Sequence, residues 1–378
     1  MDPKQTNSSL FKEKILNNRF VVYAIMISIL CLTILSISKI AFILKPFIIF
    51  IETIFLPLLL AGICFYLFNP LIDFMEKRGV KRFISIIILY LIIIGVIVGI
   101  VLSVLPPLKD QIQSLIHNLP KLNKDIQSII NQLTQSDLVA QAREKFNKDI
   151  TKIVDNISGD LSKYVSTLSH GVVSFVGTIT EVILSIVVLP FLLFYLLKDG
   201  KKLPNYIAKF LPNQMRQEAK GIMSDMNHAL SSYIRGQIFV SFCIGLLLFI
   251  GYLIIGLDYA LLLAVIAMVT NVVPYLGPII AISPAIVLAI VHSPFMLLKL
   301  AIVWVVVQLL EGKVISPQVM GKSLHIHPIT VIFVILTAGN LFGIVGIILA
   351  VPGYAIIKVI VTHIYQFVRL RSRYYSDS

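Results

Sequence analysis

The sequence predicts an all-α polytopic membrane protein with about eight transmembrane helices. The chain has 378 residues, of which 57% are hydrophobic and only 13% are charged, and its mean hydropathy is +0.92. A soluble surface needs more charge than this composition supplies. Apolar windows of about 20 residues, the length that crosses roughly 30 Å of hydrocarbon as a helix, recur along most of the chain. They are continuously apolar and do not alternate at every second residue, so they favour helices over barrel strands.

Three transmembrane helices are predicted in residues 20–105, at about Phe20 to Ile37, Ala41 to Phe68 and Phe83 to Leu105. The first window lacks a small-residue cleavage site and further spans follow it directly, so we expect a retained helix and not a signal peptide. Basic residues outnumber acidic ones in the tail of residues 1–19 and in the loop after the second helix. Both segments are therefore predicted to be cytoplasmic.

Residues 106–170 form a polar insert with helical periodicity. Apolar side chains recur at steps of three or four from Ile112 to Leu133 and again from Leu138 to Leu168. We expect an extracytoplasmic amphipathic helical hairpin, which serves either as an oligomerisation or gating element or as a solvated spacer. Its apolar stripe has no evident partner in the sequence except a second copy, which favours a homo-oligomer.

The second half of the chain returns to the membrane. Residues 171–197 are predicted to form a transmembrane helix, residues 198–235 cytoplasmic interfacial helices, residues 236–368 a C-terminal transmembrane transport core, and residues 369–378 a cytoplasmic tail. With both termini inside, the number of crossings is even. Eight crossings satisfy this if each broken stretch described below crosses once, and re-entrant hairpins satisfy it equally.

Two long apolar stretches of the core are broken near their middle. The stretch from Ala260 to Ile290 is interrupted at "NVVPYLGP", and the one from Ile329 to Val361 at "GNLFGIVG". In the first break, two prolines remove backbone donors and Gly277 loosens the turn. Irregular backbone at membrane depth is tolerated only beside protein or a water-filled cavity, so nearby carbonyls are expected to face a solute or ion. The alternatives are a kink that shapes packing only and a short turn outside the membrane.

Glu311 is a second candidate, because it follows an apolar span and shares a helical face with Trp304 and Gln308. A carboxylate in this position can bind a cation or carry a proton. The alternative is an interfacial glutamate that pairs with Lys313 or Lys322.

Other chemistry is not indicated. The chain has no HExxH, GxSxG, Walker A or GxGxxG motif in the required context, so no enzyme activity and no cofactor are predicted. The three cysteines have unrelated spacings, and His325 with His327 is too sparse a set for a metal site. The net charge of +13 comes from bases beside the apolar windows, which predicts contact with membrane lipid and not with nucleic acid.

Four segments together resemble the AI-2E family of transporters, also called autoinducer-2 exporter-like permeases. They are "YIRGQ" (Tyr233 to Gln237), "GLDYALLLAVIAMVTNVVPYLGPII" (Gly256 to Ile280), "QLLEGKVISPQVMGKSLHIHP" (Gln308 to Pro328) and "GNLFGIVGIILAVP" (Gly339 to Pro352). The resemblance implies a multi-pass protein of the bacterial cytoplasmic membrane that transports without ATP hydrolysis. Family members have been linked to export of autoinducer-2 and to exchange of sodium or lithium against protons. The family positions that it carries over as a transport path are Asn271, Pro274, Tyr275, Gly277, Pro278, Gln308, Glu311, Pro317, Gly321, Asn340, Gly343, Gly346 and Pro352.

The sequence therefore predicts a secondary transporter that exports a small polar solute such as autoinducer-2. Its solute path is expected to lie between the two broken stretches, with Glu311 as the proton- or cation-sensitive group. A Na⁺(Li⁺)/H⁺ antiporter and a non-transporting oligomeric membrane scaffold are the alternatives.

Overall fold

The computed structural model describes residues 19–39, 41–135, 188–320 and 326–376. Every regular element in these ranges is a helix, so the predicted all-α class is confirmed. Five described helices are long and apolar enough to cross a membrane: Thr53–Lys77, Arg82–Ser103, Asn213–Ile255, Pro294–Met320 and Pro328–Gln366. Most of the helix predicted at 171–197 lies outside the described residues, so the total of about eight crossings stays a prediction.

The chain divides into two units, Met1–Leu59 and Leu60–Ser378. The first unit holds α2 (Arg19–Lys39) and the beginning of α3 (Ala41–Lys77). Large apolar side chains of α2 are more than half exposed, with Ile27 at 61% and Leu32 at 63%. Such exposure is expected for a helix whose neighbour is lipid and not protein.

In the second unit, α3 continues to Lys77 and does not end at Phe68 as predicted. The continuation is amphipathic, because Ile72 is fully buried while Asp73 and Glu76 form ion pairs. A turn through Gly79, with φ of 90°, leads into α4 (Arg82–Ser103). Ile72 packs in one apolar cluster with Ile86 of α4 and Leu193 of α8 (Leu189–Asp199).

A polar cluster around Arg82 joins the ends of these three helices. The Arg82 guanidinium donates to the carboxylates of Asp73 (3.1 Å) and Glu76 (2.8 Å), to Asn69 Oδ1 (2.9 Å) and to the carbonyl of Leu197 (2.6 Å). Lys201 adds ion pairs to the same two carboxylates at 2.9 and 3.2 Å. The hydrogen bond to Asp73 raises the pKa of Lys201 above its ordinary value. The contact therefore persists at neutral pH and is lost when strongly alkaline pH deprotonates the lysine or when acid protonates Asp73.

We expect Arg82→Ala to lower the free energy of unfolding by about 2 kcal/mol, because hydrogen bonds to a charged group at a partly buried site are lost together. Thermal unfolding in detergent measures this change. Lys202→Ala is the matched control: its ion pair with Asp199 is an exposed i,i+3 contact at 2.7 Å, and its loss is expected to leave the unfolding temperature unchanged. An equal effect of both substitutions would contradict the role given to Arg82.

The segment predicted as interfacial is mostly part of one long helix. After α8 come η2 (Gly200–Lys202), α9 (Leu203–Lys209) and η3 (Asn213–Met215). The helix α10 then runs without interruption over Arg216–Ile255. The sequence predicted a boundary near Arg235, between interfacial helices and the transmembrane core. The polar first half and the apolar second half are each periodic, and nothing between them stops a helix.

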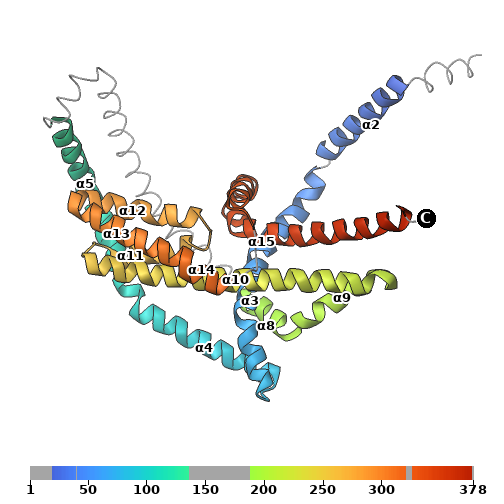
Figure 1. The fold of residues 1–378 in the computed structure, drawn as a ribbon, viewed down its shortest axis with the longest axis horizontal. Helices are drawn as coiled ribbons and strands as arrows, with labels where there is room; N and C mark the ends of the chain where they lie inside the picture. The colour runs from blue at the N-terminus through green and yellow to red at the C-terminus, as the bar shows by residue number, and fades with distance from the viewer. Residues whose placement is uncertain (1–18, 40, 136–187, 321–325, 377–378) are drawn as a thin grey trace, which may run out of the picture. The chain divides into compact units, whose positions relative to one another are not determined.

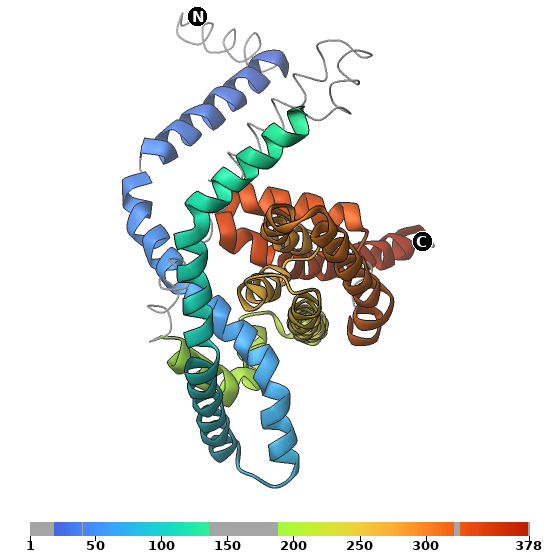
Figure 2. The ribbon, with the colours of Figure 1, turned by 90° about the vertical axis from the view of Figure 1, so that its left-hand side faces the viewer.

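The core of the second unit is built on α10. A left-handed Gly256, with φ of 72°, closes α10, and the amide of Leu257 donates to the carbonyl of Tyr252 at 2.9 Å. The chain then forms α11 (Ala260–Thr270), α12 (Leu276–His292) and α13 (Pro294–Leu310). The helices α11 and α13 pack on α10, and α12 packs on α11 and α13. Figure 1 shows these helices running roughly alongside one another, and Figure 2 shows them nearly end-on.

The first arm of the predicted hairpin insert is α5 (Leu105–Gln135), and its apolar stripe is partly covered, with Leu115 and Ile126 buried and Ile116 43% exposed. Leu115 belongs to the buried cluster of α10 to α13. Gln111 Oε1 accepts from the amide of Leu262 at 2.9 Å, and Asn118 Nδ2 donates to the hydroxyl of Tyr259 at 3.0 Å. Gln111 thus satisfies a free amide at the start of α11. The described part of the stripe thus has a partner within the chain. The second arm lies outside the described residues, and self-association stays a prediction.

The chain ends with η4 (Glu311–Ile315), α14 (Ser316–Met320) and α15 (Pro328–Ser376). The helix α15 is not continuous, because Gly343 has φ of 62° and ψ of −145°. This conformation is open only to glycine and divides the element at the predicted second break.

Candidate functional site

The first broken stretch folds into a tight helical hairpin. α11 has 11 residues, about 17 Å of helix, which is too short to cross hydrocarbon. α12 packs back along it (Figure 1). The two helices approach closely where Gly277 faces Thr270 and Asn271. A Cβ on Gly277 would lie 2.6 Å from the Cα of Asn271. The stretch therefore reverses direction within the fold, which favours re-entry over crossing among the two arrangements that the sequence leaves open.

The tip of this hairpin, Asn271 to Tyr275, is closed by an unusual turn. Tyr275 has φ of 62° and ψ of −48°, and the amide of Leu276 donates to the carbonyl of Pro274 at 2.7 Å. This is a γ-turn of the rare positive-φ type, which is strained for a residue with a Cβ. Strain of this kind persists where the surrounding structure fixes the backbone, and it is concentrated at functional sites.

The tip carbonyls are used by the protein itself. Those of Thr270 and Val273 accept from the amides of Val273 (3.0 Å) and Gly277 (2.9 Å). The carbonyl of Asn271 accepts from Gln237 Nε2 at 2.6 Å, and that of Gly277 accepts from the Thr270 hydroxyl at 3.2 Å. The turn and neighbouring side chains thus give each of these carbonyls one hydrogen bond, and the expectation that freed carbonyls face a solute stays a prediction.

Three polar side chains from separate elements meet at the tip. Asn271 is 1% exposed and Gln237 of α10 is 5% exposed. The Glu311 carboxyl group, at the end of α13, interacts with the Asn271 side chain. Apart from this interaction with each other, Asn271 Nδ2 and Glu311 Oε2 are buried with no hydrogen-bond partner among the described residues. Buried polar groups are rarely left without full pairing, so the cluster Gln237–Asn271–Glu311 is suited to exchange further hydrogen bonds with a polar ligand.

The local helix geometry places Glu311 in this cluster. Residues Glu311–Ile315 form a π-helical turn, in which the amide of Ser316 donates to the carbonyl of Glu311. A π-turn inserts one residue into a helix, changes the direction of the side chains beyond it, and is frequent at functional sites. Glu311 makes no ion pair with Lys313 or any other described residue; Lys322 is not described.

Two further unpaired polar groups lie on α10. Ser241 Oγ and Tyr252 Oη are buried without hydrogen bonds in the described part of the chain. Ser241 is one turn from Gln237 on the same helix face, since helical residues four apart are neighbours. All four unpaired side chains thus lie on α10 or on segments that contact it.

The second broken stretch also reverses direction. Gly339 lies against Ile347, and Gly346 lies against Ala338. The residues of each pair are eight apart in the sequence, and a continuous helix would separate them by about 12 Å. The arms on either side of Gly343 therefore pack together. Val273 and Leu276 of the first tip join the same apolar cluster as Ile335 and Val351 of this second hairpin, together with Tyr233 of α10. The two broken stretches therefore share one apolar cluster, and a solute path between them stays a prediction.

The other predicted path residues are dispersed. Pro274 and Pro278 are half-buried around the tip turn, Gly277 is buried, and Tyr275 is 47% exposed. Gln308 is half-buried one turn before Glu311, and Pro317 is exposed. In the second hairpin, Asn340 and Gly343 are exposed while Gly346 and Pro352 are buried, and Gly321 lies outside the described residues. The structure brings Asn271 and Glu311 together and does not place Asn340 or Pro317 beside them.

Gln237 belongs to the site in the structure but is not among the path residues predicted from the sequence. It lies in the "YIRGQ" segment, but no periodicity distinguishes it from a solvated interfacial residue. The only indication in the sequence is the position of this side-chain amide at the start of an apolar run, because a buried amide requires a hydrogen-bond partner. The partner, the carbonyl of Asn271, is 34 residues away in the sequence.

A polytopic helical protein with helical hairpins around buried polar groups has the features expected of a membrane transport protein. The family model described as "AI-2E family transporter" matches residues 24–366, and the chain belongs to this family. It is similar to "Putative transport protein YueF" of Bacillus subtilis, with 36% identity over 95% of this chain and 97% of that protein. "Putative transport protein YrrI" of the same organism is 30% identical over 87% of this chain and 91% of its own. "Putative permease PerM" of Escherichia coli is 26% identical over 47% of this chain and 50% of its own length.

Proposed function

We propose that this protein is a secondary transporter whose polar site is the cluster Gln237–Asn271–Glu311, and that it exports a small polar solute such as autoinducer-2. The proposal is carried by one observation: Asn271 Nδ2 and Glu311 Oε2 are buried together at a hairpin tip, with no hydrogen-bond partner among the other described residues. A donor and an acceptor in a low-dielectric site suit a hydroxyl-rich solute, which satisfies both groups and gives up its own hydration. Membership of the family supports transport as the activity.

Sodium or lithium exchange against protons is the second candidate. The carboxyl of Glu311 favours it, because a membrane-embedded carboxylate can bind a cation in one state and a proton in the other. We further propose that the protein lies in the bacterial cytoplasmic membrane with both termini cytoplasmic. The basic residues of the 77–82 and 198–202 segments support this orientation, since the Arg82 cluster joins these segments at one end of the fold.

The test is a flux measurement in proteoliposomes containing the full chain. Autoinducer-2 counterflow and sodium-driven pH change are measured in parallel for wild type, Glu311→Gln and Asn271→Ala. We expect either substitution to lower the relevant flux about 10- to 100-fold, the equivalent of one hydrogen bond to a charged group. Sodium-dependent pH changes that vanish in Glu311→Gln identify the antiporter, and autoinducer-2 counterflow without a sodium requirement identifies the exporter.

Glu218→Gln is the matched control. Glu218 is an exposed residue in the first turn of α10, and the same chemical change there is expected to leave flux unaltered. Ser241→Ala distinguishes an effect on folding from an effect on transport. Removing an unpaired buried hydroxyl is neutral or stabilising for folding, but it lowers flux if the hydroxyl contacts the solute. Wild-type flux that none of the cluster substitutions changes would refute the site, and the absence of any wild-type flux would favour the scaffold.

A further inference from the structure

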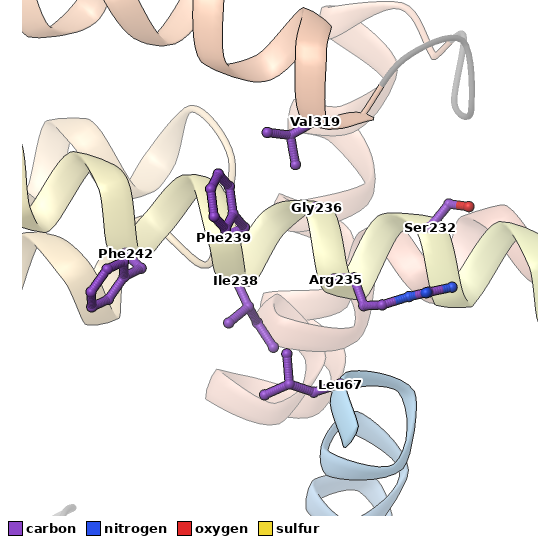
Figure 3. A pocket seen from close by; sticks show the side chains of 8 residues that line it. All are labelled: Leu67, Ser232, Arg235, Gly236, Ile238, Phe239, Phe242 and Val319. Atoms are coloured by element: carbon purple, nitrogen blue, oxygen red, sulfur yellow. The ribbon is translucent and has the colours of Figure 1, made fainter. Parts of the chain in front are cut away.

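A groove separate from the buried cluster lies beside the middle of α10. It has a volume of about 630 Å³, within the range of roughly 300–1,000 Å³ typical of small-molecule sites. Helices α3, α10 and α14 contribute its walls (Figure 3). Its apolar lining consists of Leu67, Ile238, Phe239, Phe242 and Val319.

Gly236 allows the groove to have this shape. A Cβ at this position would lie 3.0 Å from Met320 Cγ and 3.6 Å from Val319 Cγ1, so the absence of a side chain lets α14 approach α10. Figure 3 shows Val319 above Gly236 and Leu67 on the opposite side of α10, near Ile238. The groove thus runs across the face of α10 between two other helices.

The polar end of the groove consists of Arg235 and Ser232, which are three residues apart on α10. The Arg235 guanidinium is held by its own helix: Nε donates to the carbonyl of Ser231 at 3.0 Å, and Nη2 donates to the Ser231 hydroxyl. A guanidinium has five N–H donors, so three remain for another group. Arg235 forms no ion pair with a described residue. An arginine fixed by two bonds and still carrying free donors is suited to bind a phosphate.

The apolar part of the groove is exposed, and we expect it to face the hydrocarbon. Phe239 and Phe242 are each 53% exposed, and both lie in the apolar half of α10 that begins after Arg235. A ligand in contact with them and with Arg235 must therefore combine an acyl chain with an anionic group. The basic side chain at the start of an apolar helical segment is where the headgroup layer is expected.

We propose that this groove binds one anionic glycerophospholipid of the surrounding bilayer, with its phosphate at Arg235 and Ser232 and an acyl chain along Phe239 and Phe242. The site is distinct from the Gln237 cluster, because Gln237 is buried on the α10 face that contacts Asn271 whereas Arg235 is exposed. The bound lipid fills the space between α3, α10 and α14 and ties these helices together at the membrane boundary.

Native mass spectrometry of the full chain, released from micelles that hold phosphatidylglycerol and phosphatidylcholine with identical acyl chains, tests this site. Phosphatidylglycerol is expected to be retained about five-fold more than phosphatidylcholine, which is the preference that one basic residue near the surface gives. Arg235→Gln is expected to abolish the preference. Phe239→Ala combined with Phe242→Ala is expected to reduce retention of both lipids, and because both rings are half exposed the variant is expected to fold.

Arg78→Gln is the matched control, because Arg78 is also a basic residue but stacks on Phe74 at 4.3 Å, away from the groove. It is expected to keep the preference. The proposal is overturned if Arg78→Gln and Arg235→Gln act equally, if Arg235→Gln keeps the wild-type preference, or if free glycerol 3-phosphate displaces the lipid. The last result identifies a site for soluble phosphates.

Discussion

Gly277→Ala is expected to abolish transport and to destabilise the fold, because the new methyl group has no space at the tip of the first hairpin. Its Cβ would collide with the carbonyl oxygen of Thr270 and would lie 2.6 Å from the Cα of Asn271. These are backbone atoms, so no rotation of a side chain relieves the contact. The helices α11 and α12 must move apart, at a cost in the upper part of the roughly 1–3 kcal/mol that overpacking incurs.

The same movement affects the site directly. Asn271 is held by the hydrogen bond from Gln237 to its carbonyl, and a displaced Asn271 backbone moves the amide away from Glu311. Thermal unfolding and flux in proteoliposomes measure the two effects. Gly99→Ala on α4 is the control, because a Cβ at Gly99 meets nothing within 4 Å, and it is expected to change neither quantity. A fully active Gly277→Ala protein would show that the hairpin tip does not position the site.

The sequence predicted the hairpin breaks but not their internal geometry. Pro274, Gly277 and Pro278 marked the first break because proline and glycine interrupt helices by known mechanisms. In the structure Pro278 lies in the first turn of α12, where a missing amide costs nothing, and the strained residue is Tyr275. A positive φ at tyrosine is imposed by packing around the turn, and no local pattern predicts it.

The contacts that complete the site are long-range, and for that reason the sequence did not predict them. The sequence indicates Glu311 as a site residue by its position after an apolar span, and Asn271 by its position in the break. Their proximity depends on the packing of α13 beside α12 and on the π-turn at Glu311. The covering of the α5 stripe by the core is of the same kind. Gln111 and Leu262 are 151 residues apart, and an amphipathic stripe shows that a partner exists without identifying it.

Gly346→Ala is expected to open the second hairpin, with an effect comparable to that of Gly277→Ala. A Cβ at Gly346 would collide with the carbonyl oxygen of Ala338 and would lie 2.8 Å from Phe342 Cβ. Gly346 is buried and Ala338 belongs to the opposite arm, so the arms must separate. Since Ile335 and Ile347 of these arms share an apolar cluster with Val273 and Leu276, the displacement extends to the first hairpin tip. We therefore expect lower flux as well as lower stability.

Substitutions at two neighbouring glycines distinguish a steric clash from backbone strain. Gly353→Ala is the control, because a Cβ there meets nothing within 4 Å; it is expected to be neutral or slightly stabilising, as for a helical glycine replaced by alanine. Gly343→Ala has equally free space, but φ of 62° with ψ of −145° strains any residue with a Cβ. It is expected to lower stability by about 1–3 kcal/mol through the backbone alone. If Gly346→Ala behaved like Gly353→Ala in thermal unfolding and flux, the arms would not be in contact, and the second hairpin would have no part in supporting the Asn271 tip.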